Sequence, residues 1–486
     1  MRPSRLPVAV ALVASVAFLA APRAVADDRA AVDALNAPML PVPEKARSWK
    51  PLFDAYLAMT PAPAKGMDAL SVWPGMENWK EVSAWAAANG AMGEAIIAAQ
   101  QALAFGMPYG RDAVGPTYVE RGVVIRIGEG EAVFRSEPLY LGALDTVTAW
   151  VTAEMYRLGA EKQFDRAFDL GLATLRLLRQ VADQHLLEEK VWALQEMADM
   201  ASIQRDVLQT FLDEIPAETV KRMALTGYAF VRSSDGERLR RLDMPEGDRV
   251  LAEVLIGQLF DAGGQPEAAR FASTMGDMQA KDEPLSAFGA ARRWQQIAAL
   301  HGSKDQTIAR LTNMYDDWWR RWRLAYRDKL LDNPTVISRT NGTRYAMVLL
   351  AVKDLERVFA LRQRLNAELN GTVLAFGLCA RYRASGWPTS FDQTYTQFTV
   401  KRFDRDPWSP RWGMGSEDRW QYERLSAPRD IETDFGRLQV SGAMLYSVGV
   451  DGQDGGAVKA TMDGVTGDFV AWPALRALAR AQGAAK

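Results

Sequence analysis

Hydrophobic side chains recur at three- and four-residue steps through residues 79–369. This spacing puts them on one face of a helix, so it predicts a succession of amphipathic α-helices. In one example Thr146, Trp150 and Ala153 share a face. Asn-Gly and Gly-Gly pairs separate the segments as turns. The pattern is typical of a helical-hairpin array, and it predicts a mainly α protein.

Two stretches depart from this helical period. Residues 27–78 are rich in proline, which predicts an extended wrap over the surface with one short helix near residues 52–59. Residues 117–137 show β-type apolar runs on both sides of Gly128-Glu-Gly130. They predict a small β-hairpin inserted in the helical domain.

Residues 370–486 form a separate α+β module in this interpretation. Asn370-Gly371 should end a long helix, and a second helix should cover residues 372–383. A loop dense in Asp and Gly, residues 451–456, lies between two short apolar strands. Such a loop either forms tight turns or supplies oxygen ligands to a hard cation. A helix followed by short strands predicts a small antiparallel sheet.

This module resembles the globular domain of the major pseudopilins of type II secretion. That family shows a helix ending in Tyr, a Gly-aromatic-Pro turn, an Asp-Pro-Trp, an aromatic-Gln-Tyr strand, a Tyr-Ser-x-Gly-x-Asp-Gly loop with a later Gly-Gly, and an Asp-x-x-x-Trp. The matching residues occur here in the same order: Tyr382, Gly386-Trp387-Pro388, Asp406-Pro407-Trp408, Trp420-Gln421-Tyr422, Tyr446-Ser447-Val448-Gly449-Val450-Asp451-Gly452, Gly455-Gly456, Asp468 and Trp472. The chain is also similar to a group of large exported bacterial proteins, familiar from planctomycetes, that carry the module behind a helical region.

The resemblance implies a structural calcium ion in the Asp/Gly loop. Matched position by position, it assigns side-chain oxygens to Ser447, Asp451 and Asp468, and backbone carbonyls to Leu445 and Val448; Asp454 matches less well. The alternative is that these carboxylates only cap turns. A pseudopilin begins with a long apolar helix that builds a filament, whereas this chain begins with an export signal. Filament assembly is therefore not implied.

The N-terminus predicts export. Arg2 and Arg5 precede a short apolar run, and Ala24-Val-Ala26 follows, as in a secretory signal peptide over residues 1–26; the alternative is an uncleaved anchor. The mature chain should lie outside the cytoplasm, in the periplasm or cell envelope, with no integral membrane span. Cys379 is the only cysteine, so internal disulfides are excluded. The formal net charge of −2 does not favour a nucleic-acid partner.

Catalytic candidates are few. Only two histidines occur, and one of them, His185, could meet Glu188 and Glu189 on one helix face, although a solvated helix face explains the same spacing. A second candidate is an aromatic helix face, which suits either a sugar-binding platform or core packing. It comprises Trp318, Trp322 and Tyr326, with Trp319 and Arg323 on the neighbouring face.

We therefore expect an exported, non-catalytic structural or protein-binding component with an unidentified protein partner. The alternative is an extracytoplasmic hydrolase acting on sugar or peptide at a cleft between the helical and C-terminal parts. A pocket with convergent carboxylates beside Trp318 or Trp319 would favour the hydrolase. A third option is a structural protein bound to the envelope.

Overall fold

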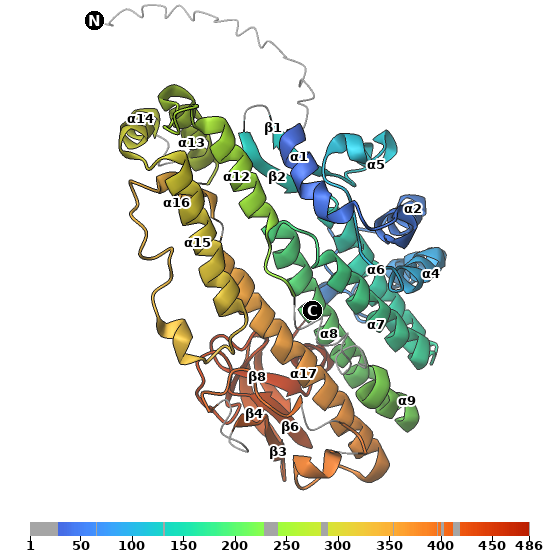
Figure 1. Ribbon diagram of the computed structural model, residues 1–486. Helices are drawn as coiled ribbons and strands as arrows, with labels where there is room; N and C mark the ends of the chain where they lie inside the picture. The colour runs from blue at the N-terminus through green and yellow to red at the C-terminus, as the bar shows by residue number, and fades with distance from the viewer. Residues whose placement is uncertain are drawn as a thin grey trace, which may run out of the picture.

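The computed structural model describes residues 28–64, 66–129, 132–227, 242–282, 290–352, 354–395, 397–399, 403–411 and 418–485. The predicted signal peptide, residues 1–26, lies outside these ranges. The described chain is mostly helical, with a two-stranded sheet near the N-terminus and a six-stranded sheet near the C-terminus (Figure 1). None of the described helices combines the length and hydrophobicity that a membrane span requires.

The helices form an array of neighbouring segments. Their bounds are α1 Arg29–Asn36, α2 Trp49–Ala58, α3 Trp79–Ala88, α4 Gly90–Ala99, α5 Pro116–Glu120, α6 Leu141–Ala160, α7 Phe164–Val181, α8 Leu187–Phe211, α9 Ala217–Arg222, α12 Gly247–Leu259, α13 Ala268–Asp282, α14 Ala290–Leu300, α15 Lys304–Trp322, α16 Ala346–Ala351, α17 Leu355–Ser385 and α18 Leu475–Ala481. Helices α6, α7 and α8 pack on one another in sequence, which agrees with the predicted hairpin array.

The N-terminal segment is more helical than expected. Helix α1 begins after Asp28, whose carboxylate accepts a hydrogen bond from the Ala31 amide at 2.9 Å. The short 3₁₀ helices Ala37–Met39, Glu44–Ala46 and Ala69–Ser71 follow in the same region. Pro38 and Pro51 occupy first turns, where a missing amide hydrogen is tolerated, so they do not prevent these helices. The prediction of an extended wrap is wrong for these residues, while α2 matches the predicted short helix.

The predicted hairpin is present over a shorter range. Strand β1, Ile125–Glu129, pairs antiparallel with β2, Ala132–Pro138. Residues 116–120 form the short helix α5 and not a strand. Pro116 occupies the first helical position, where its fixed backbone angle favours the start of a helix. The residues at the hairpin tip, 130 and 131, lie outside the described ranges.

The prediction that a helix ends at Asn370-Gly371 is wrong. One continuous helix of 31 residues runs through both positions. A Cβ atom built on Gly371 would lie 2.8 Å from the Cβ of Ala471 and 2.8 Å from the ring of Trp420. Gly371 therefore allows close packing of the helix against the sheet, and it does not end the helix.

The C-terminal sheet is mixed, whereas a small antiparallel sheet was predicted. Its strands are β3 Gln421–Arg424, β4 Arg429–Thr433, β5 Gly436–Val440, β6 Ala443–Ser447, β7 Lys459–Thr461 and β8 Asp468–Trp472. They lie in the order β3-β6-β8-β7-β4-β5, and β7 runs parallel to both β4 and β8. Because β7 and β8 are parallel neighbours, residues 462–467 return the chain to the end of the sheet at which β7 begins, which strand lengths alone do not predict.

Helix α17 joins the two parts of the chain. It packs on α8 and also contacts β6 and β8 (Figure 1). Arg205 of α8 lies 2.6 Å from the Glu368 carboxylate of α17, and both side chains are buried. The two groups form an ion pair, but their geometry does not meet the angles of a hydrogen bond. Arg476 of α18 and Asp206 of α8 form a second buried pair, also at 2.6 Å. The Arg205 guanidinium also lies over the Phe469 ring of β8, so the buried charged contacts of α8 extend to the sheet.

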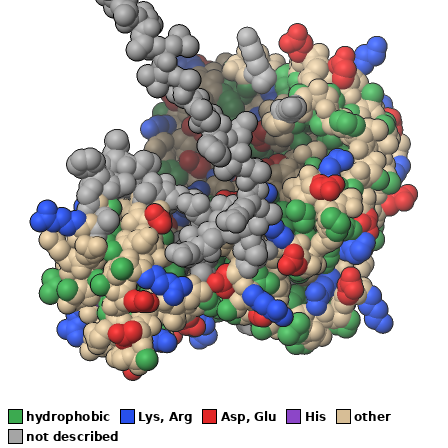
Figure 2. Space-filling model, turned by 90° about the horizontal axis from the view of Figure 1, so that it is seen from above, with side chains coloured by type: hydrophobic (Ala, Val, Ile, Leu, Met, Phe, Trp, Pro, Cys, Tyr) green, Lys and Arg blue, Asp and Glu red, His purple; other side chains and the backbone are tan. Residues whose placement is uncertain are grey.

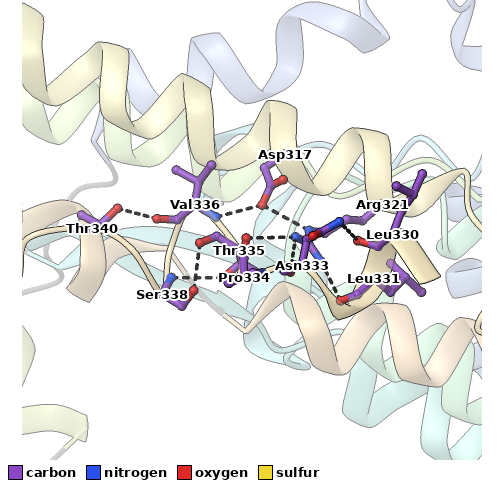
Figure 3. Close-up of polar contacts among 10 residues, drawn as sticks. All are labelled: Asp317, Arg321, Leu330, Leu331, Asn333, Pro334, Thr335, Val336, Ser338 and Thr340. Carbon is purple, nitrogen blue, oxygen red and sulfur yellow. Dashed lines mark hydrogen bonds and ion pairs between the residues drawn. The ribbon is translucent and has the colours of Figure 1, made fainter. Parts of the chain in front are cut away.

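The connector between α15 and α16, which contains the short 3₁₀ helix Lys329–Asp332, lies along α15. Arg321 donates hydrogen bonds to the carbonyls of Leu331, Asn333 and Pro334, and Asp317 accepts from the Val336 amide at 2.9 Å (Figure 3). Two side chains one turn apart on the helix thus hold the connector in place.

Candidate functional site

The predicted calcium ligands Ser447 and Asp468 lie on opposite faces of the C-terminal sheet. Ser447 of β6 is paired with Phe469 of β8, so their side chains share a face, and Asp468 points to the opposite face. The Ser447 hydroxyl donates to the Asp406 carboxylate at 2.6 Å. Ser447 therefore does not converge with Asp468, which corrects that part of the predicted site.

The loop carboxylates accept hydrogen bonds from nearby backbone amides. Asp468 accepts from Gly455 at 3.3 Å and from Ala457 at 2.7 Å, and Asp451 accepts from Gln453 at 2.9 Å. Burial raises the pKa of Asp468, and the charges of Asp454 and Asp451 raise it further. These three acids are thus close enough to repel one another, and they form turns of the kind that the alternative interpretation describes.

The two predicted carbonyl ligands do not extend this set. Leu445 lies within β6, between β3 and β8, so its backbone groups face the neighbouring strands. The Val448 amide donates to Asp406 at 3.0 Å. Among the described residues no three His, Cys, Asp or Glu side chains are grouped to hold a metal. The predicted five ligands do not form a cage as they are placed.

Asp406 is a buried residue of this region that sequence reasoning did not assign to a site. Its carboxylate accepts from Ser447, Val448 and the Trp408 amide, and burial raises its pKa to about 6. Arg327, from the α15–α16 connector, donates to the carbonyls of Trp408 and Val450. In the sequence, the Asp-Pro-Trp motif was the signal that could have indicated a structural role for Asp406. Through the Arg327 contacts, the α15–α16 connector is joined to the C-terminal module at this point.

The aromatic face of α15 is mostly core. Trp318 and Trp322 are buried and pack against Phe359 of α17. Trp319 is half-buried, and its indole nitrogen donates to the Glu246 carboxylate. An open hollow of about 530 Å³ beside it is lined by Asp316, Trp319, Arg320, Arg323 and Leu324. Only one of these is a carboxylate, so the convergent pair expected of a hydrolase is not found at this place.

His185 and Glu189 do not act together. Glu189 is buried and accepts hydrogen bonds from the Tyr109 and Tyr140 hydroxyls, each at 2.8 Å, and from the Leu186 amide. Burial raises the pKa of Glu189 to about 7 and lowers that of His185. The His185 ring stacks on Tyr109. The carboxylate therefore caps the start of α8.

A cavity of about 380 Å³ lies where the helical part meets the C-terminal sheet, and we call it the junction cavity. Its charged lining comes from α8, α17, α18 and the residue preceding the short helix Ala69–Ser71. These charged residues are Arg364, Arg476, Arg480, Asp68 and Asp199. Leu70, Phe435 and Met462 add apolar wall. The lining thus holds three cations and two carboxylates.

The three arginines differ in how fully they are paired. Arg476 binds Asp206 at 2.6 Å and the Ser202 hydroxyl at 2.8 Å. Arg480 donates to the Leu70 carbonyl at 2.6 Å and lies over the Trp73 ring. Arg364 lies 3.6 Å from the Asp199 carboxylate, beyond hydrogen-bond distance. The Nε atoms of Arg364 and Arg480 are buried and have no hydrogen-bond partner in the described chain.

Burial perturbs the carboxylates beside this cavity. It raises the pKa of Asp199 to about 6, although Arg364 and Arg476 act in the opposite direction. It also raises the pKa of Glu196, one turn earlier on α8, to about 8, and the charge of Asp199 adds to that effect. Near neutral pH Glu196 is therefore mostly protonated and Asp199 mostly ionised.

No family model, curated protein or solved structure matches this chain. The junction cavity is assembled from residues near positions 68, 199, 364, 435, 462 and 476, which no local sequence pattern connects. Only the alternative hypothesis, which placed a cleft between the helical and C-terminal parts, pointed to this location. The chemistry of the lining has to be argued from its geometry.

Proposed function

We propose that the protein is an exported, non-catalytic binding component that takes its ligand or its partner's acidic group into the junction cavity. One observation carries this proposal. Three arginine side chains line one cavity, and Arg364 among them lies 3.6 Å from Asp199, beyond hydrogen-bond distance. Guanidinium groups that line a cavity suit an oxygen acceptor supplied by a ligand.

Other features support this role. The charged and apolar N-terminal segment supports export to the periplasm or cell envelope. The ordered motifs of residues 382–472 support a module related to pseudopilins, used here for binding. On the face shown in Figure 2, basic and acidic side chains of the described residues are interspersed, and such a mixture favours a protein or small-molecule partner over nucleic acid. Calcium in the Asp/Gly loop stays a prediction, with Asp451 and Asp468 as the predicted carboxylate ligands.

A hydrolase at the same cavity is the second candidate. Asp199 lines the cavity and Glu196 lies one turn earlier on α8, and both have raised pKa values, as acid–base catalysts often do. Turnover of a sugar or peptide substrate that disappears in both Glu196→Gln and Asp199→Asn would favour this candidate. Binding without turnover favours the non-catalytic role.

A dye attached at the cavity rim tests the binding role. Ser71 is exposed and lines the cavity, while the natural Cys379 is fully buried. Ser71→Cys therefore gives one accessible thiol for an environment-sensitive fluorophore. Ser338→Cys, on the α15–α16 connector, provides a matched label away from the lining.

We expect compounds from a library of acidic and neutral small molecules to change the fluorescence at position 71, but not at position 338. A library in which every active compound affects both labels equally, or none affects position 71, would contradict the proposal.

A further inference from the structure

We infer that the junction cavity binds a small organic oxyanion, held by Arg364 and Arg480, and that Asp199 competes with this ligand for Arg364. This inference rests on the proposed binding function and names its ligand class. Carboxylate, phosphate and sulfonate groups share the required chemistry, because each presents oxygen acceptors that guanidinium groups bind in pairs.

The two contacting arginines approach from different elements. Arg364 belongs to α17 and Arg480 to α18, and both line the same cavity. Arg480 is held in place by the Leu70 carbonyl and by the Trp73 ring, whereas among the described residues Arg364 has its loose contact with Asp199 alone. One arginine is therefore positioned before binding, whereas the other has a partner that it can exchange.

The third arginine serves differently. Arg476 is nearly fully buried and already binds Asp206 and Ser202. The Asp206 carboxylate largely balances its charge, so Arg476 forms part of the cavity wall and does not have to change partners.

The apolar lining selects the rest of the ligand. Leu70, Phe435 and Met462 line the cavity beside the arginines. A bare inorganic ion would leave this surface in contact with water. An oxyanion carried on a small apolar body covers it, and burial of that body adds affinity in proportion to its area.

Asp199 makes the site sensitive to pH. It faces Arg364 and Glu368 of α17, Arg476 of α18 and Asp68, while Glu196 lies near it on α8. Burial raises the pKa of Asp199 to about 6. Protonation below that pH neutralises the competitor and releases Arg364 for the ligand. Anion affinity should therefore increase as the pH falls through about 6, by up to about tenfold per pH unit above that value.

Benzenesulfonate is a suitable probe because its charge is constant between pH 5 and pH 8. Benzenesulfonamide has nearly the same shape and is neutral over this range. Both are titrated against the full chain by calorimetry at pH 5.0 and pH 7.5. We expect the sulfonate to bind more tightly than the sulfonamide, and at least tenfold more tightly at pH 5.0 than at pH 7.5.

Four variants locate the effect. Arg364→Gln and Arg480→Gln should each weaken sulfonate binding by roughly 10-fold or more, the usual consequence of losing a charged hydrogen bond. Arg383→Gln, a similarly exposed arginine on α17 outside the cavity, should bind like the wild type. Asp199→Asn should bind tightly at both pH values, and this gain cannot result from misfolding.

The outcomes separate the two levels of the proposal. Equal binding of sulfonate and sulfonamide, abolished at the cavity arginines, would overturn the oxyanion inference and leave the binding function standing. Unchanged pH dependence in Asp199→Asn would overturn the competition. Failure of the sulfonate to bind would overturn the inference, and failure of the whole dye screen would overturn the binding function as well.

Discussion

Replacement of Gly371 by Ala tests how closely α17 packs on the C-terminal sheet. The new Cβ would lie 2.8 Å from the Cβ of Ala471 and from the Trp420 ring, and the Ala471 atom is fixed to the backbone of β8. Overpacking of this kind costs about 1–3 kcal/mol, and the higher helix propensity of Ala returns up to about 1 kcal/mol. We expect a net loss of about 1–2 kcal/mol.

Gly276→Ala provides the matched control. Gly276 also lies inside a helix, α13, but outside that helix's own backbone no atom of the described residues lies within 4 Å of its Cβ position. Only the propensity term remains, so this variant should gain about 0.5–1 kcal/mol. Urea unfolding followed by circular dichroism measures both changes. Equal stability of the two variants would refute the close approach of α17 and β8, and with it the shared boundary of the two parts.

Three further predictions concern charged groups. Glu368→Ala should cost about 3–5 kcal/mol in urea unfolding, because it leaves the buried Arg205 without a charged partner. Glu432→Ala, which removes an exposed carboxylate, should cost less than about 1 kcal/mol. Similar losses in the two variants would contradict this prediction. Asp199→Asn should raise the free energy of unfolding by about 1–2 kcal/mol at pH 7.5 and leave it unchanged at pH 4. The reason is that the pKa of Asp199 is raised to about 6 in the folded protein, so stability falls as the pH rises from about 4 to 6 and the carboxylate ionises. A loss of stability at pH 7.5 would show that the ionised carboxylate stabilises the fold. Calcium at millimolar concentration should raise the melting midpoint relative to chelator, as any ligand bound only by the folded state does, and identical midpoints would remove the calcium prediction.

Helical periodicity predicted the array well because packing of apolar faces decides those elements. It failed at Asn370-Gly371 because glycine serves two purposes. A glycine can end a helix or admit a neighbouring strand, and only the position of Ala471 distinguishes the two. The parallel pairing of β7 was also hidden, since strands of a few residues carry no signal of direction.

The candidate site was less predictable than the fold. The motifs near residues 447–468 left open a calcium site or capped turns, and strand register places Ser447 and Asp468 on opposite faces. Arg364 and Arg480 had no distinguishing sequence context. Their proximity depends on the docking of α18 beside α8, which is a tertiary property.

A crystal structure of the protein grown with benzenesulfonate tests ligand entry into the junction cavity most directly. We expect the sulfonate oxygens within hydrogen-bond distance of Arg364 and Arg480, with the ring against Phe435 and Met462. A cavity closed by protein side chains, or a sulfonate bound only elsewhere, would contradict the assignment.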